Sequence, residues 1–184
     1  KLLTRARHAA ELDVPLLIIG ETGTGKEYLT QAIHKLSRRA DGPFVPYNCG
    51  CGSPELMDAE FFGHKRGSFT GASATRDGLV RTAHKGTLFL DEIAELTQQL
   101  QSRLLRMMES GEIRPVGSDT SEFVDVRIIS ATHQDLARKV EAGTFRRDLY
   151  HRLAGIELHV PPLRDRLDDL EILVEHFTAV AREL

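Results

Sequence analysis

A glycine-rich segment that ends in lysine carries the clearest chemistry in this chain. Residues 16–27 read LLIIGETGTGKE, so an apolar run leads directly into three glycines and Lys26. The spacing G-x-x-x-x-G-K is that of a phosphate-binding loop (P-loop), whose glycines let backbone N–H groups converge on a phosphate at the start of a helix. Lys26 adds a mobile positive charge for the β- and γ-phosphates. The residues predicted to bind a nucleoside triphosphate are Gly20, Glu21, Thr22, Gly23, Thr24, Gly25, Lys26 and Glu27.

The last position of the loop departs from the usual pattern. A Ser or Thr normally follows the lysine and places a hydroxyl on Mg²⁺, but this chain has Glu27. Either another part of the chain holds the metal, or the chain belongs to a P-loop family that accepts Glu here.

Two adjacent carboxylates supply the second half of the predicted site. The apolar run 87–90 ends in Asp91 and Glu92, which places both acids at the carboxyl end of a strand, where open α/β sheets bind ligands. Asp91 can hold Mg²⁺ directly or through water, and Glu92 is suited to be the general base for an attacking water. The pair therefore predicts hydrolysis rather than transfer to another substrate. The alternative, a strand that ends in a solvated acidic turn, is less favoured because a P-loop precedes it.

Composition limits the classes of protein to consider. The chain has 184 residues and a formal net charge of −3, which fits one domain, or one domain and part of a second, and argues against nucleic-acid binding by bulk electrostatics. Cys49 and Cys51 form a single C-x-C pair, which favours reduced thiols over a zinc site or a disulfide framework. The sequence has no signal peptide or membrane-spanning run, so we expect a cytoplasmic protein with no membrane partner.

Apolar runs alternate with helical patterns along the chain. The runs predict strands at 16–19, 44–47, 87–90, 126–130 and 156–160, and the patterns predict helices at 26–38, 53–61, 98–109 and 134–142. Such alternation predicts an α/β fold with a mostly parallel sheet between two layers of helices. Residues 63–77 and 111–125 do not fit the alternation and look like insertions, where partner contacts are common.

The end of the chain has the pattern of a further helix. Asp168 and Asp169 resemble an N-cap pair, and an apolar stripe follows at helical spacing. Its members are Leu170, Leu173, Phe177, Val180 and Leu184. Because no later element in the sequence covers this stripe, we expect the chain to be a fragment of a longer protein.

The first insertion contains the most specific pattern in the chain. Residues 63–72 read GHKRGSFTGA, a short basic segment followed by Phe69 and Thr70 between glycines. An exposed Phe at a glycine-flanked tip is expected to contact a partner. Residues 67–72 resemble the GAFTGA loop of bacterial enhancer-binding proteins, the AAA+ ATPases that activate sigma-54 RNA polymerase. The resemblance assigns sigma-54 contact to Gly67, Ser68, Phe69, Thr70, Gly71 and Ala72, with Ser68 in place of the usual Ala.

Further motifs resemble those of the same family, in the same order. Residues 20–27 are similar to the family's GESGTGKE loop, which also ends in Glu. Asn48 is similar to the family's switch asparagine, which hydrogen-bonds the glutamate that corresponds to Glu92. Thr132 matches the threonine of the sensor I motif, whereas His133 stands where the family typically has Asn.

The resemblance also implies catalysis between subunits. Residues 145–153, FRRDLYHRL, are similar to a family motif whose two outer arginines, here Arg146 and Arg152, reach into the ATP of the neighbouring subunit. Without the resemblance they would be interpreted as a charged helix face. Their spacing does not put them on one helix face, so we expect different roles. Residues 161–166, PPLRDR, resemble the link to a helical lid, which predicts an AAA+ α/β subdomain at 1–162 and the start of a truncated lid at 163–184.

These features predict a Mg²⁺-dependent ATPase that remodels the closed complex of sigma-54 RNA polymerase. The resemblance implies a homo-oligomeric ring, a hexamer or heptamer, that contacts DNA only through a domain absent from this chain. Two alternatives stay open: a nucleotide-binding regulatory scaffold with little turnover, and an AAA+ ATPase that acts on another macromolecule. Because most of the lid and the neighbouring subunit are missing, we expect the 184 residues alone to hydrolyse ATP weakly.

Overall fold

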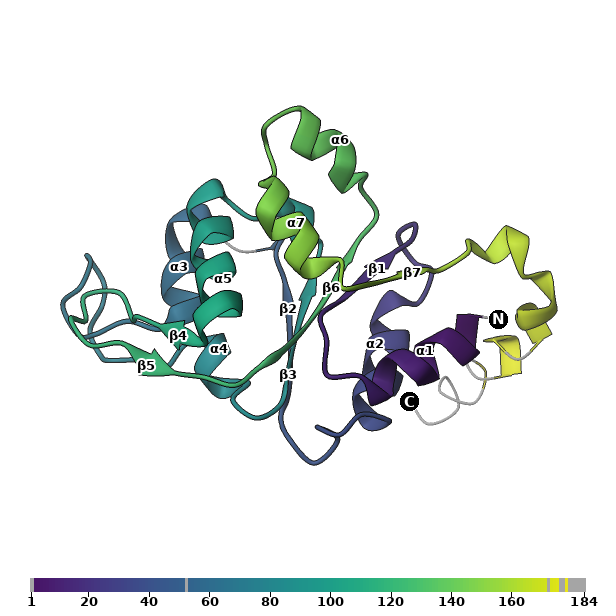
Figure 1. The fold of residues 1–184 in the computed structure, drawn as a ribbon, viewed down its shortest axis with the longest axis horizontal. Coiled ribbons are helices and arrows are strands. Elements are labelled where there is room, and N and C mark those ends of the chain that lie inside the picture. Colours follow the sequence, from purple (N-terminus) through teal and green to yellow (C-terminus); the bar gives the residue numbers. More distant parts are fainter. Residues whose placement is uncertain (1, 52, 172, 176–177, 179–184) are drawn as a thin grey trace.

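A five-stranded parallel sheet forms the centre of the molecule (Figure 1). The computed structural model describes residues 2–51, 53–171, 173–175 and 178. Every strand pairing in this sheet is parallel, so the sheet is more uniform than the mostly parallel one predicted from the sequence. In spatial order the strands are β2 (Phe44–Asn48), β3 (Thr87–Asp91), β6 (Arg127–Thr132), β1 (Leu16–Ile19) and β7 (Ile156–His159).

Helices cover both faces of the sheet because successive strand residues point to opposite sides. On one face, Leu17 of β1 and Leu88 of β3 pack in a cluster with α3 (Pro54–Phe62), α4 (Leu79–Thr82), α5 (Gln98–Ser110), α6 (Leu136–Glu141) and α7 (Arg147–Leu153). On the other face, Leu16 and Phe89 pack with α1 (Leu2–Glu11) and α2 (Lys26–Lys35). The sheet is therefore buried on both sides, as its continuous apolar strands predict.

The five predicted strands and four predicted helices are confirmed, with ends that agree or differ by up to three residues. The α1, α4 and α7 helices were not among the four helices predicted from the sequence. The buried face of α1 consists of Ala6, Ala9 and Ala10, and such small side chains give a weak apolar periodicity. The α4 helix is a single turn, too short to show a period.

The two predicted insertions leave the sheet and contact each other at one end of the molecule (Figure 1). The second contains the short antiparallel strands β4 (Glu112–Ile113) and β5 (Glu122–Phe123), which were not predicted. Lys65 N–H donates to the carbonyl of Val116 at 3.0 Å, and Val116 N–H donates to the carbonyl of Gly63 at 2.9 Å. The insertions are thus joined through their backbones.

Two 3₁₀ turns, Leu163–Asp165 and Leu167–Asp169, follow β7. The predicted helix follows this second turn directly, since residues 170, 171, 173–175 and 178 are helical. Asp168 and Asp169 come just before it, within the second turn, which Asp169 N–H closes on the carbonyl of Arg166. Phe177, Val180 and Leu184 of the predicted apolar stripe lie outside the described residues. None of the helices in the described part of the chain has the length and apolar character needed to cross a bilayer.

Candidate nucleotide-binding site

The P-loop connects the carboxyl end of β1 to the first residue of α2. Gly23 and Gly25 have positive φ values of 78° and 86°, a left-handed backbone that glycine adopts without steric cost. A Cβ added to either glycine would meet nothing within 4 Å, so the space beside the loop is open. Gly25 has no side chain to cap α2, which leaves the first N–H groups of the helix directed at this space. The loop therefore has the form of an anion site at a helix N-terminus.

Lys26 places its ammonium group within the loop. Its side chain is buried, and Nζ donates hydrogen bonds to the carbonyls of Gly20 at 3.0 Å and Glu21 at 3.1 Å. The Thr24 hydroxyl also donates to the Glu21 carbonyl, at 2.8 Å. An anion held by the loop would replace these carbonyls as the hydrogen-bond partner of the Lys26 ammonium.

The segment after β7 is tied to the P-loop through two arginines. Arg164 donates two hydrogen bonds to the carboxylate of Glu21, at 2.6 and 2.8 Å. Arg166 Nη2 donates to the carbonyl of Thr24 at 2.6 Å. Both arginines belong to the PPLRDR motif, so the predicted link to a lid lies directly against the loop.

Asp91 and Glu92 lie at the carboxyl end of β3, at the same edge of the sheet as the P-loop. Asp91 Oδ1 accepts a hydrogen bond from Glu92 N–H at 3.0 Å. Burial raises the pKa of the Asp91 carboxyl; the charges of Glu92 and Glu27 raise it further, while the Glu92 N–H and Lys26 oppose the shift. These electrostatic partners show that the P-loop lysine and the acidic pair share one site.

The partners of Glu92 differ from those that the family resemblance implies. Both carboxylate oxygens of Glu92 lie 2.8 Å from Nδ1 of His133. Asn48, expected to bind Glu92, instead accepts a hydrogen bond from Gly50 N–H at 2.8 Å through its own Oδ1. The sequence flagged His133 only as a departure from the family pattern; a titratable side chain directly after a central strand was the signal that it belongs to the site.

Thr132, the other sensor I residue, supports the backbone of the site. It is buried at the end of β6, and its hydroxyl accepts a hydrogen bond from Gln134 N–H at 3.0 Å. Its carbonyl accepts a hydrogen bond from Gly20 N–H at 3.1 Å. Thr132 therefore connects the sensor segment to the start of the P-loop.

The carboxylates of the site fit Mg²⁺ that arrives with a nucleotide better than a metal held by protein ligands alone. Within the described residues there is no cluster of three or more His, Cys, Asp or Glu side chains able to hold a metal ion. Mg²⁺ commonly uses one or two carboxylates together with substrate phosphates and water. Asp91, beside the P-loop lysine, is the residue placed to serve in this way. Cys49 is buried and Cys51 exposed, and both are free thiols.

The two predicted arginines lie at opposite ends of α7. Arg146 donates to the carboxylate of Asp148 through Nε at 3.0 Å and Nη2 at 2.7 Å, and to the Ser102 hydroxyl at 3.1 Å. Arg152 donates to the carbonyl of Met108 at 3.0 Å. The contacts of both arginines in this chain are therefore with α7 and α5 rather than with the P-loop.

The predicted partner loop, residues 67–72, forms a closed turn. Gly67 N–H donates to the carbonyl of Ala72 at 2.8 Å, and Gly67 and Gly71 have positive φ values of 79° and 101°. Thr70 is exposed at the tip, whereas Ala72 is buried at 6% exposure.

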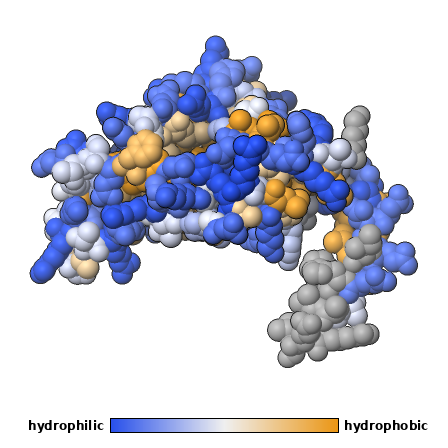
Figure 2. All heavy atoms as spheres, turned by 60° about the horizontal axis from the view of Figure 1, so that its bottom comes forward, coloured by the Kyte–Doolittle hydropathy of each residue, from blue (hydrophilic) through white to orange (hydrophobic). Residues whose placement is uncertain are grey.

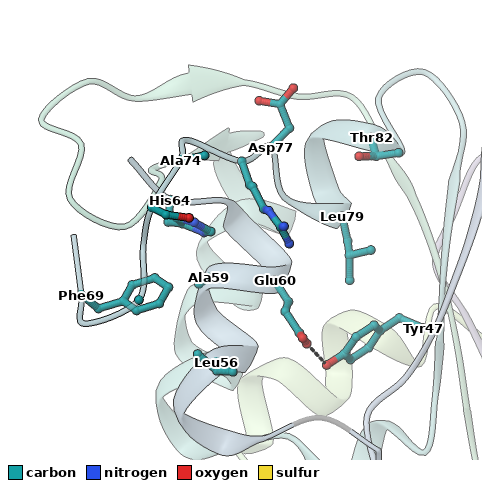
Figure 3. A pocket seen from close by; sticks show the side chains of 13 residues that line it. Tyr47, Leu56, Ala59, Glu60, His64, Phe69, Ala74, Asp77, Leu79 and Thr82 are labelled. Atoms are coloured by element: carbon teal, nitrogen blue, oxygen red, sulfur yellow. Dashed lines mark hydrogen bonds between the residues drawn. The ribbon is translucent and has the colours of Figure 1, made fainter. Parts of the chain in front are cut away.

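The expectation that Phe69 is exposed is wrong. Its side chain is half-buried, and its ring packs edge-on against His64 with 5.0 Å between ring centroids. Both rings line a cavity of about 520 Å³ beside α3, together with Leu56, Ala59 and the hydrogen-bonded pair Tyr47 and Glu60 (Figure 3). The turn therefore folds back on the molecule, with the Phe69 ring against His64.

Comparison with known proteins agrees with this geometry. A profile of the family described as the Sigma-54 interaction domain matches residues 1–159. The chain belongs to this family and has the AAA+ P-loop NTPase fold of sigma-54-dependent transcriptional regulators.

Two curated relatives illustrate the similarity. Transcriptional regulatory protein GlrR of Escherichia coli (strain K12) is 46% identical over 183 residues, which make up 100% of this chain and 41% of GlrR. Response regulator protein PilR of Pseudomonas aeruginosa is 52% identical over 166 residues, or 90% of this chain and 37% of PilR. The chain thus spans about two fifths of the length of these relatives.

Solved structures give the same result. NtrX from Brucella abortus in complex with ADP has a TM-score of 0.88 and 38% identity, with 96% of this chain and 38% of NtrX covered. The ATP complex of NtrX has a TM-score of 0.87, at 38% identity, over 96% of this chain and 40% of NtrX. The P-loop NTPase domain of a sigma-54 transport activator from E. coli has a TM-score of 0.59 at 22% identity, over 88% of this chain and 92% of that domain, and supports the fold alone.

Proposed function

We propose that this chain binds ATP with Mg²⁺ and hydrolyses it as the AAA+ domain of a sigma-54-dependent transcriptional regulator. The observation that carries the proposal is the P-loop, with the Lys26 ammonium inside it, at the same sheet edge as Asp91 and Glu92. The similarity to NtrX, a protein solved with ATP and with ADP, supports nucleotide binding.

Some residues of the site bind the nucleotide, and others take part in its hydrolysis. The N–H groups of the P-loop and the start of α2 hold the phosphates, and Lys26 offsets their charge. Asp91 would hold Mg²⁺, directly or through water, and the metal would neutralise charge that develops on the phosphates. Glu92 accepts the proton of the attacking water. The family resemblance adds Asn48 and Thr132 to the catalytic set: Asn48 pairs in register with Asp91, and the carbonyl of Thr132 accepts a hydrogen bond from Gly20 N–H of the P-loop.

We further propose that hydrolysis occurs between subunits of a ring and moves residues 67–72 against sigma-54 RNA polymerase. The family description names sigma-54 interaction, which supports the choice of partner. Arg146 or Arg152 of one subunit would complete the ATP site of the next. Because Gly63 and Lys65 of the first insertion are hydrogen-bonded to Val116 of the second, a movement of one insertion would be transmitted to the other.

A pair of substitutions in the full-length protein tests the ATPase. Lys26→Ala removes the charge that meets ground-state phosphates, so ATP binding should be lost. Glu92→Gln keeps the shape of the side chain but removes the base, so ATP should bind normally and turnover should fall by about 100-fold or more. Nucleotide binding and phosphate release measure the two effects. Normal turnover in Glu92→Gln would show that Glu92 is not the general base. A wild-type protein that binds ATP without hydrolysing it would favour the regulatory scaffold instead.

A further inference from the structure

The contact between His133 and Glu92 assigns a role to a residue that the family pattern left without one. We propose that His133 is a positioning residue, which fixes the Glu92 carboxylate at the catalytic edge through its Nδ1–H. This inference rests on the proposed ATPase, in which Glu92 is the base.

The order of the strands places His133 between the two halves of the site. His133 directly follows β6, and β6 lies between β3, which ends at the acidic pair, and β1, which leads into the P-loop. Thr132, the residue before His133, accepts the hydrogen bond from Gly20 N–H at 3.1 Å. The imidazole of His133 therefore reaches Glu92 from the segment in which Thr132 is hydrogen-bonded to the start of the P-loop.

The chemistry of the pair defines which nitrogen carries the proton. An ionised carboxylate only accepts hydrogen bonds, so Nδ1 must be the donor, and in the neutral ring Nε2 is then an acceptor. Both oxygens of Glu92 lie 2.8 Å from Nδ1. The side chain of Glu92 is 17% exposed, and that of His133 is 44% exposed. His133 thus contacts the Glu92 carboxylate at an edge of the sheet that solvent still reaches.

The backbone of Glu92 also has an uncommon conformation. Glu92 has φ 51° and ψ 48°, a left-handed conformation that is uncommon outside glycine. A base must reach its water within hydrogen-bonding distance, so the direction of the carboxylate decides the rate. Among the described residues, Glu92 has no hydrogen bond to the family's asparagine; the side-chain bond of Asn48 is from Gly50 N–H to its Oδ1.

The first test compares substitutions of His133 with the same changes at His8, an exposed residue of α1. In the full-length protein, His133→Ala should lower kcat by about 10-fold or more and change the Kd for ATP by less than about 3-fold. His133→Asn should recover most of kcat, because its amide can donate to Glu92. His8→Ala and His8→Asn should leave both constants unchanged.

The double variant distinguishes positioning from an independent effect. If His133 acts through Glu92, His133→Ala should add no further loss to Glu92→Gln. Losses that multiply, or a His133→Ala protein with wild-type or faster turnover, would overturn the proposal. If Glu92→Gln itself retains turnover, the proposed function has failed instead.

A second readout needs no hydrolysis. In nucleotide-free protein, ¹⁵N NMR of the histidine rings should show His133 as the Nδ1–H tautomer, and Glu92→Ala should abolish this preference. A His133 ring with the proton on Nε2 in the wild type would contradict the contact.

Discussion

At the scale of single residues, Phe69 combines a predicted partner contact with an observed intramolecular one. Its ring packs on His64 and lines the cavity beside α3, while its backbone belongs to the turn at 67–72 (Figure 3). For the ring to meet sigma-54, it must leave His64, and an aromatic pair of this kind contributes only about 0.5–1.5 kcal/mol. The contact is therefore weak enough to be exchanged for a contact with a partner.

Replacement of Phe69 by Ala should separate these two roles. We expect a loss in the free energy of unfolding of about 1 kcal/mol, well below the ~3–5 kcal/mol of a fully buried Phe. ATP binding and turnover should persist, whereas nucleotide-dependent binding to sigma-54 should disappear. Phe123→Ala, the same change at a side chain that is 70% exposed in the second insertion, is the matched control. Unchanged sigma-54 binding, or a stability loss as large as that of a core residue, would argue that Phe69 is structural.

Local sequence predicted which residues form the site but not how they pair. Lys26, Asp91 and Glu92 could be identified because their chemistry lies within short motifs. The contact of Glu92 with His133 joins residues 41 positions apart, and the burial of Phe69 depends on a ring from another turn of the insertion. Such contacts are set by the sheet order and by loop closure, which spacing along the chain does not encode.

At the scale of elements, the strands and the positions of the insertions were predictable, and the structure inside the insertions was not. A buried parallel strand needs a continuous apolar run, and these runs are visible in the sequence. The strands β4 and β5 have only two residues each, too few to show alternation. Their position is set by backbone hydrogen bonds between the insertions and by Gly117, whose missing Cβ leaves room for Ser68.

A substitution at Gly117 tests whether the insertions work as a unit. A Cβ at Gly117 would lie 2.6 Å from Cβ of Ser68, and the backbone there has φ 74°. Gly117→Ala should therefore push residues 67–72 out of place and reduce binding to sigma-54 by about 10-fold or more, at unchanged ATP affinity. Gly143→Ala is the matched control, since Gly143 has φ 71° and nothing within 4 Å of an added Cβ. Equal effects of the two variants on sigma-54 binding would show that strain alone, and not contact between the insertions, is responsible.

At the scale of the whole molecule, the proposed catalysis between subunits predicts that the ATP site of one chain is incomplete. Arg146 is held by Asp148 and Ser102, and Arg152 by Met108, so neither is directed at its own P-loop in this structure. Figure 2 shows a face on which hydrophilic side chains separate small apolar groups, which suits contacts that form and break more than a permanent apolar interface. We therefore expect ATP turnover per chain to be low for the 184 residues alone and to rise with the concentration of the full-length protein.

Mixing two inactive variants tests catalysis between subunits directly. Glu92→Gln lacks the base but keeps the arginines, whereas Arg146→Ala keeps the base but lacks one arginine. Each full-length variant should be inactive alone if Arg146 acts on the neighbouring ATP. In a mixed ring, an Arg146→Ala subunit has an intact P-loop and base, and a Glu92→Gln neighbour supplies the missing guanidinium, so phosphate release should reappear on mixing.

Mixing Glu92→Gln with Lys26→Ala, two variants damaged in the same half of the site, should restore nothing and serves as the control. If the first mixture also stays inactive while both variants still assemble, Arg146 does not act in trans, and the same experiment with Arg152→Ala decides whether the other end of α7 supplies the arginine.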